Sequence, residues 1–484
     1  MRKRFEQQIE IGQLLIKDTR IPIKFHDSMT ELMAALKEIF VTPKYNEQVF
    51  AILEEAIITG KKQTGRHGMD LWQLFVLSQV RLCLNIGYNR LHYVANYDKL
   101  LRQIMGIEKG SQFAPIEVEY QNIYDNVTLL NDATVRQLND VIVEFGHEVF
   151  KKKEQAVLRL KTDSFVVENT VHFPTDYNLL WDCARKCLDG ISSFVEKYSE
   201  IDNWRKLQNW RYQLKGLMRE VGKASSSGGK NKDKRLKQAT SRYLLKANAF
   251  VKKLQIDINN FPILDSYDID KYNEILHFMR LLIIHIDLVD RRIIKGEIIP
   301  HEEKMFSIFE TYTEMINKGK KHPSVELGKK LTITTDQYNL IIDYKLMNEE
   351  QDREIVGELV NRILARFNVF SWSFDKGFWL KENKKLLQEY IPMVVMPKLG
   401  KRNQEEEEEE TARIFKKLKN KHSAIESNIN ELEHRGLDRC PDKGFRNFSR
   451  YVALAVTAYN LKKIGRQLLI IERQKQLKQA LQAA

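Results

Sequence analysis

The strand-rich segments of this sequence fall into two groups far apart in the chain, and this spacing most strongly constrains the fold. Residues 156–173, AVLRLKTDSFVVENTVHF, are rich in β-branched and apolar side chains and predict a strand that runs into a second extended stretch. Residues 177–320 then show helical periodicity. Strand character returns at 330–347, where KLTITTDQYNLIIDYKLM predicts two strands joined by a turn at 336–339. A single sheet would have to be assembled from both pieces.

The second piece continues with alternating helices and strands. The sequence predicts a helix at 349–367, the strand VFSWSF at 369–374, a helix at 380–389, the apolar run IPMVVMP at 391–397 and a long helix through Glu426. Without the helical block, a compact mixed unit of strands and helices remains. We therefore expect a mixed α/β or α+β core that is interrupted by a long helical insertion.

The first part of the chain shows helical periodicity alone. Apolar residues at spacings of three and four predict helices at 29–40, 46–58, 69–84 and 133–151. The predicted organisation is an all-α N-terminal region at 1–152, a discontinuous core at 153–176 and 325–470, a helical insertion at 177–324, and a polar, glutamine-rich helical tail at 471–484.

The net charge of +13 favours a polyanionic partner such as nucleic acid, although a basic protein without such a partner is the alternative. No apolar run approaches the roughly 20 residues that span a bilayer. The basic start MRKRFEQQIE is followed by no apolar core of a signal peptide. The 4 cysteines are too sparse for a disulfide framework. We expect a cytoplasmic protein with no membrane partner.

Two basic segments are candidates for contacts with a nucleic-acid backbone. Residues 60–68, which include Arg66, are rich in glycine and basic residues, and either contact DNA or simply link two helices. Residues 223–237, KASSSGGKNKDKRLK, predict a flexible loop that fits a strap on DNA and a solvated surface loop equally well. The basic residues of this second segment include Lys230, Lys232, Lys234 and Arg235.

Three carboxylates lie where a catalytic metal site would need them. Cleavage of phosphodiesters without a covalent intermediate uses two metal ions held by carboxylates from rigid elements. Asp163 lies in the first predicted strand, Asp375 directly follows VFSWSF, and Glu426 lies at the edge of the apolar seam of the late helix. Taken singly, each has an ordinary explanation: a strand-end residue, a helix N-cap and a surface glutamate. Together they match the plan of an RNase H-like nuclease, in which the first strand, the fourth strand and a late helix each supply one acid.

Three blocks of sequence follow one another in a specific order. They are KTDS at 161–164 with HFPTD at 172–176, FDKGF at 374–378 with PKLGK at 397–401, and HSAIESNIN at 422–430. In this order they resemble the catalytic blocks of bacterial insertion-sequence transposases of the DDE type. The resemblance is to a loosely classified group with an InsH-like N-terminal region, and it covers most of the chain.

The resemblance implies an enzyme that cuts DNA at the ends of a mobile element and joins the freed 3′ ends to target DNA. Asp163, Asp375 and Glu426 would hold two Mg²⁺ or Mn²⁺ ions, while His172 and Asp176 would support them from a second layer. The N-terminal region would bind DNA or dimerise. Since two ends are cut together, the resemblance implies a homodimer on double-stranded DNA, with terminal inverted repeats and target DNA as partners.

Basic residues near the three blocks are further candidates for DNA contacts. Lys398, Lys401 and Arg402 follow the apolar run beside the site and would hold DNA phosphates, or they form an ordinary basic turn. Related families often carry a basic residue seven positions after the glutamate, where this chain has Glu433. His434 or Arg435 would then take that role.

Two other functions fit the same residues. A catalytically silent, transposase-derived DNA-binding protein would keep the fold without the chemistry. An RNase H-like DNA nuclease would cut DNA without strand transfer.

Overall fold

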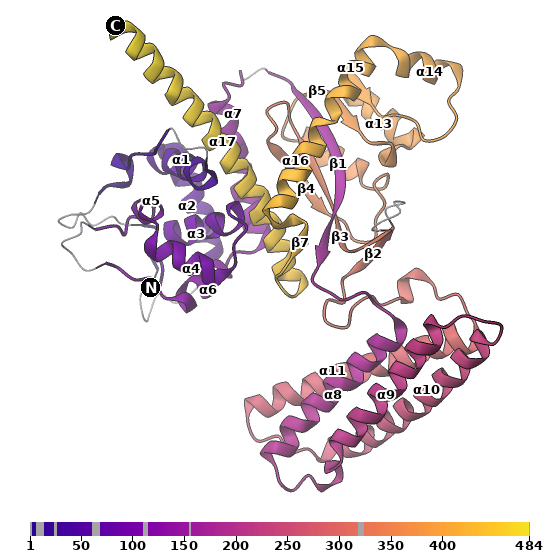
Figure 1. Cartoon of the computed structure of the whole chain (residues 1–484). Helices are drawn as coiled ribbons and strands as arrows, with labels where there is room; N and C mark the ends of the chain where they lie inside the picture. Colours follow the sequence, from indigo (N-terminus) through magenta and orange to yellow (C-terminus); the bar gives the residue numbers. More distant parts are fainter. Residues whose placement is uncertain are drawn as a thin grey trace. The chain divides into compact units, whose positions relative to one another are not determined.

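The computed structural model describes residues 2–5, 14–23, 27–60, 68–109, 115–153, 156–317 and 324–483, and the chain forms two compact units (Figure 1). The first, here called the sheet unit, comprises Met1–Thr170 and Ile316–Ala484. The second, called the helical unit, comprises Val171–Met315. The sheet unit therefore combines the N-terminal helices with both strand-rich pieces of the sequence.

The N-terminal part of the sheet unit is helical, which confirms the prediction from apolar periodicity. Its helices are α1 (Ser28–Val41), α2 (Pro43–Ile57), α3 (Leu71–Cys83), α4 (Tyr88–Tyr97), α5 (Lys99–Ile104), α6 (Tyr120–Val127) and α7 (Asp132–Val149). Side-chain caps mark where α1, α5 and α7 begin. The Asp27 carboxylate accepts a hydrogen bond from the N–H of Met29 at α1, and the Asn131 side chain accepts one from the N–H of Thr134 at α7.

The last helix, α17 (Phe445–Ala483), packs on α1, α3 and α7. At Gly465 the approach to α1 is so close that an added Cβ would lie 1.7 Å from the carbonyl oxygen of Glu31. Only glycine permits this contact, because every other side chain would push the two helices apart. The polar residues predicted as a helical tail form the exposed end of this same helix.

The sheet takes strands from both pieces of the sequence. The strands are β1 (Leu158–Asn169), β2 (Glu314–Asn317), β3 (Val325–Thr335), β4 (Ile341–Leu346), β5 (Val369–Phe374), β6 (Met393–Val395) and β7 (Arg439–Cys440). Their order is β2-β3-β1-β5-β6, with β4 also paired to β3 and β7 to β1. β3 is antiparallel to β1, whereas β5 and β6 run parallel to it. The fold is thus mixed α/β with a mixed sheet.

Five α-helices lie between β4 and β7 in the sequence. They are α12 (Val356–Leu364), α13 (Lys381–Tyr390), α14 (Gln404–Thr411), α15 (Arg413–His422) and α16 (Ala424–Leu432). The predicted single long helix through Glu426 is wrong, because the chain breaks at Ala412, where ψ is 138°, and again at Ser423. α14 buries no side chain, whereas Phe415 and Ile425 are buried. α12 is likewise shorter than the helix predicted at 349–367.

Side chains of the central strands alternate between two faces, and both faces carry helices. Leu160 and Trp372 are buried in an apolar core with residues of α12 and α13. By the two-residue period of a strand, Lys161, Asp163 and Ser373 occupy the opposite face. α15 and α16 pack against β1 and β5 there. This second face carries the polar groups described below.

The helical unit contains four long helices (Figure 1), namely α8 (Asp176–Lys197), α9 (Leu207–Ser226), α10 (Lys232–Asp257) and α11 (Ser266–Val289). The flexible loop predicted at 223–237 is largely helical, and only residues 227–231 connect α9 to α10. Lysine, arginine and leucine are strong helix formers, so the short Ser-Gly-Gly stretch alone interrupts the helices. Among the residues described, no helix has the length and apolar character needed to cross a membrane.

Candidate functional site

Two of the predicted carboxylates lie at the same level of two adjacent parallel strands, β1 and β5. Thr162 of β1 pairs with Phe374 of β5, so Asp163 and Asp375 stand at the next position of each strand. Asp163 is half-buried within β1, and Asp375 is exposed where β5 ends. The parallel pairing of two segments that are distant in sequence is what brings these two acids together.

Asp163 is influenced by three other carboxylates. Burial raises its pKa to about 7, and the negative charges of Asp375, Asp352 and Glu426 act in the same direction. The N–H of Ser164, which donates to Asp163 Oδ1 at 2.7 Å, opposes this rise in pKa. Glu426 is exposed in the first turn of α16. The three predicted acids are therefore close enough to interact electrostatically.

Asp352 is a member of this carboxylate group that the sequence analysis missed. Its Oδ1 accepts a hydrogen bond from Ser164 Oγ at 2.7 Å, and its Oδ2 accepts one from Lys330 Nζ at 3.2 Å. At Gly377, in the turn after Asp375, an added Cβ would lie 3.1 Å from Asp352 Oδ2. Asp352 lies in the connection between β4 and α12, where the sequence analysis expected the interior of a helix, and no motif marked it.

His422 at the end of α15 is a neutral histidine beside this group. Ser373 Oγ donates to the Leu160 carbonyl at 3.2 Å and lies 3.0 Å from His422 Nδ1. Burial lowers the pKa of His422 to about 4, although Asp375 acts to raise it. Nε2 is buried without a hydrogen-bond partner in the described part of the chain.

The four carboxylates are suitable ligand types for a metal ion, but their side chains are not arranged as a metal site in the described part of the chain. Within the described ranges, no set of three or more His, Cys, Asp or Glu side chains is arranged to hold a metal ion. The four carboxylates nevertheless supply hard oxygen donors of the kind that magnesium requires. A bound divalent cation would relieve the repulsion between these carboxylates.

Two of the three basic residues predicted to contact DNA near this site, Lys398 and Arg402, form ion pairs with the acidic helix α14. Lys398 Nζ contacts both carboxylate oxygens of Glu406, at 2.8 and 2.6 Å, and its backbone N–H donates to Glu410. Arg402 Nε lies 2.8 Å from the Glu410 carboxylate. Lys401 is exposed and makes no ion pair with the residues described here. The carboxylates of Glu406 and Glu410 on α14 therefore balance two of the basic charges near the site.

The remaining basic candidates differ in their surroundings. Arg435 is engaged within the protein, since its guanidinium donates to the carbonyl of Cys83 and, at 3.0 Å, to Ser28 Oγ. Arg235 donates to the carbonyl of Gly228 at 2.6 Å. Arg66 lies outside the described residues. The other members of the basic segment, exposed or half-exposed, are Lys230, Lys232 and Lys234.

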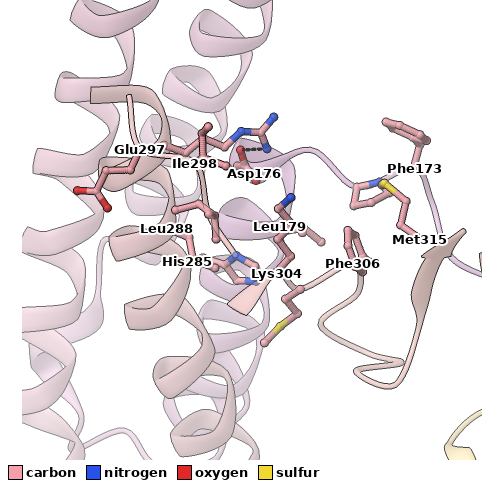
Figure 2. Close-up of a pocket in the computed structure, with 14 residues that line it drawn as sticks. Phe173, Asp176, Leu179, His285, Leu288, Glu297, Ile298, Lys304, Phe306 and Met315 are labelled. Atoms are coloured by element: carbon pink, nitrogen blue, oxygen red, sulfur yellow. Dashed lines mark hydrogen bonds and ion pairs between the residues drawn. The ribbon is translucent and has the colours of Figure 1, made fainter. Parts of the chain in front are cut away.

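The two residues expected to support the metal ligands, His172 and Asp176, lie in the helical unit and have partners there. His172 Nε2 is 3.3 Å from Asp182, and Asp176 forms an ion pair of 2.7 Å with Arg292. Asp176 also lines a cavity of about 460 Å³ (Figure 2). His285 faces this cavity, is 2 % exposed, and its Nε2 has no hydrogen-bond partner among the described residues.

None of the family models, curated proteins or solved structures compared with this chain matches it. Its function must be inferred from the carboxylate group and the charged residues around it.

Proposed function

We propose that this chain is a DNA transposase with an RNase H-like core, in which Asp163, Asp375 and Glu426 hold divalent metal ions. The observation that carries the proposal is the meeting of carboxylates from β1, from the end of β5 and from α16 at one side of a mixed sheet. Counting β1, β3, β4 and β5 as the first four core strands, the first and fourth are adjacent and parallel. This arrangement supports the RNase H-like assignment.

Metal ions bound by these carboxylates would activate the attacking oxygen and stabilise the leaving one. Asp163 lies in β1, which pairs with β3 on one side and β5 on the other, and such a position suits a ligand that must keep its place during the reaction. Asp375 is exposed at a strand end and is accessible to a DNA strand. Asp352, fixed by Ser164 and Lys330, would act as a positioning residue beside Asp163.

The proposed partner is double-stranded DNA, which the net charge of +13 favours. Transposition requires two element ends to be cut together, so the proposal includes a homodimer formed on DNA. The proposed location is the bacterial cytoplasm, where the chromosome is the substrate.

The test is Mg²⁺-dependent nicking and joining of duplexes that carry the DNA flanking the coding region in its genome of origin. Wild type is compared with Asp375→Asn and with the control Glu389→Gln, which removes an exposed charge from α13. The proposal expects joined product from wild type and the control, and none from Asp375→Asn. Cleavage without joining would instead indicate a nuclease. Tight binding to the ends without cleavage, in Mg²⁺ and in Mn²⁺, would indicate a silent DNA-binding protein.

A further inference from the structure

A cavity of about 410 Å³ lies on the same face of the sheet as Asp163 and Asp375. Lys161 of β1 and Ser371 of β5 belong to its floor, and the junction of α15 and α16 forms its wall. The cavity is assembled from β1, β5 and two late helices, as is the carboxylate group. None of its lining residues was predicted to bind DNA.

Three basic side chains that form no ion pair among the described residues line this cavity, namely Arg159, Lys161 and Lys421. Lys161 Nζ donates to the Asn339 side chain at 3.1 Å and forms no ion pair in the described part of the chain, although the charge of Asp336 partly offsets the lowering of its pKa by burial. The Arg159 guanidinium lies over the Phe370 ring, 5.9 Å from its centroid, and Lys421 is exposed. None of the three makes an ion pair in the described part of the chain, in contrast to Lys398 and Arg402, whose charges Glu406 and Glu410 balance.

The cavity also offers neutral hydrogen-bond donors. Ser371 lines the floor and the Asn420 amide lines the helical wall, whereas the Ser423 hydroxyl already donates to the Asn420 carbonyl at 2.8 Å. Unbalanced positive charge beside hydroxyl and amide donors is suited to an anion with several oxygen atoms, because each oxygen accepts from a different donor. A phosphate group has this chemistry, and a DNA backbone carries one at every nucleotide.

We propose that this cavity binds a phosphate of the DNA strand next to the phosphate that reaches the carboxylate group. Arg159, Lys161 and Asp163 are alternate residues on one face of β1, so successive side chains are roughly 6.6 Å apart. A strand laid along β1 would pass from the two cations to the carboxylates. The assignment of DNA as the source of the phosphate rests on the proposed function, whereas free phosphate or a mononucleotide offers the same chemistry.

The test measures binding in EDTA, so that it does not depend on catalysis. Lys421→Gln and Arg159→Gln each remove one exposed cation of the cavity, and Lys416→Gln removes an exposed cation of α15 that does not line it. A labelled DNA duplex is titrated by fluorescence anisotropy over a salt series. We expect Lys421→Gln and Arg159→Gln to weaken binding and each to lower the salt slope by about 1. Lys416→Gln should have a smaller effect on both quantities.

A second arm identifies the source of the phosphate. Thermal stabilisation by inorganic phosphate and by thymidine monophosphate is compared in the same variants. Weakened DNA binding, with or without loss of this stabilisation, supports the proposal even if the wild type never cleaves DNA. Loss of phosphate-induced stabilisation with unchanged DNA binding would replace DNA by a free phosphate ligand. The phosphate site would be overturned if Lys421→Gln and Arg159→Gln matched Lys416→Gln both in DNA binding and in thermal stabilisation by phosphate.

Discussion

Ser164 donates its hydroxyl hydrogen bond to Asp352 at 2.7 Å, although the two residues are 188 positions apart in sequence. The residue next to Asp163 is thereby fixed to a carboxylate that belongs to the same electrostatic group. Lys330, on the strand antiparallel to β1, contacts the other oxygen of Asp352. Asp352 is thus placed to orient the carboxylate group from outside the predicted triad.

Asp352→Asn tests this positioning role. The substitution keeps an oxygen that accepts from Ser164 but removes the charge that pairs with Lys330. We expect DNA cleavage to fall roughly 10- to 100-fold, as for other residues that orient metal ligands, whereas Asp163→Asn should abolish it. Cleavage rates at saturating Mg²⁺ measure the difference. Equal and complete loss in both variants would make Asp352 a metal ligand itself.

The repulsion around Asp163 predicts opposite effects on stability and on metal response. Asp163→Asn removes a half-buried charge that three other acids disfavour, so the metal-free protein should melt at a higher temperature than wild type. The same variant should lose the rise in melting temperature that Mg²⁺ produces in wild type. Thermal unfolding in EDTA and in Mg²⁺ measures both effects. An unchanged Mg²⁺ response would argue against Asp163 as a ligand.

The ion pairs between α14 and the basic segment after β6 predict that α14 weakens DNA binding. Replacing Glu406 and Glu410 together by Gln frees Lys398 and Arg402, and should increase the salt slope of DNA binding by about 2. The double variant Glu405→Gln with Glu408→Gln makes the same change in charge on the same helix. If both double variants strengthen binding equally, the effect comes from overall charge and not from these pairs.

His285 predicts acid sensitivity of the helical unit. Burial lowers the pKa of His285 to about 4, below the value of an unfolded histidine. Between these two values the unfolded state binds more protons, so stability falls as the pH falls, by about 2 kcal/mol at pH 5. His285→Gln should remove this component. Amide hydrogen exchange of α8 and α11, measured at pH 7.5 and pH 5, reports on the stability of the helical unit alone. If this stability depends on pH equally in wild type and in His285→Gln, the prediction is wrong.

Arg435 is predicted to stabilise the fold more than it contributes to DNA binding. Its bonds to Cys83 and Ser28 connect the segment after α16 to the N-terminal helices, and Arg435→Ala should cost about 1.5–3 kcal/mol of unfolding free energy. The control Arg439→Ala removes an exposed pair with Glu168, typically worth below ~1 kcal/mol. Urea unfolding and DNA binding are both measured. A loss of DNA affinity without a loss of stability would restore the DNA-contact role.

The central strands could be predicted from sequence because β-branched and apolar side chains alternate within short runs, as at VFSWSF, which forms β5. The N-terminal helices were equally visible from their apolar spacing. The late helix was predicted as continuous because Glu, Lys and Leu all favour helix. The break at Ala412, a residue type with the highest helix propensity, is not one that local propensity predicts.

By itself, the sequence determined the central strands and the kind of element that carries each acid: Asp163 within a strand, Asp375 directly after one and Glu426 in a helix. The tertiary structure decided which groups share a site. It placed Asp352 beside Asp163, paired Lys398 with Glu406, and left Lys161 without an ion pair in the described part of the chain. Periodicity along a chain reports which face of an element is buried, whereas contacts between distant residues depend on how the elements pack, and charge pairing follows from those contacts.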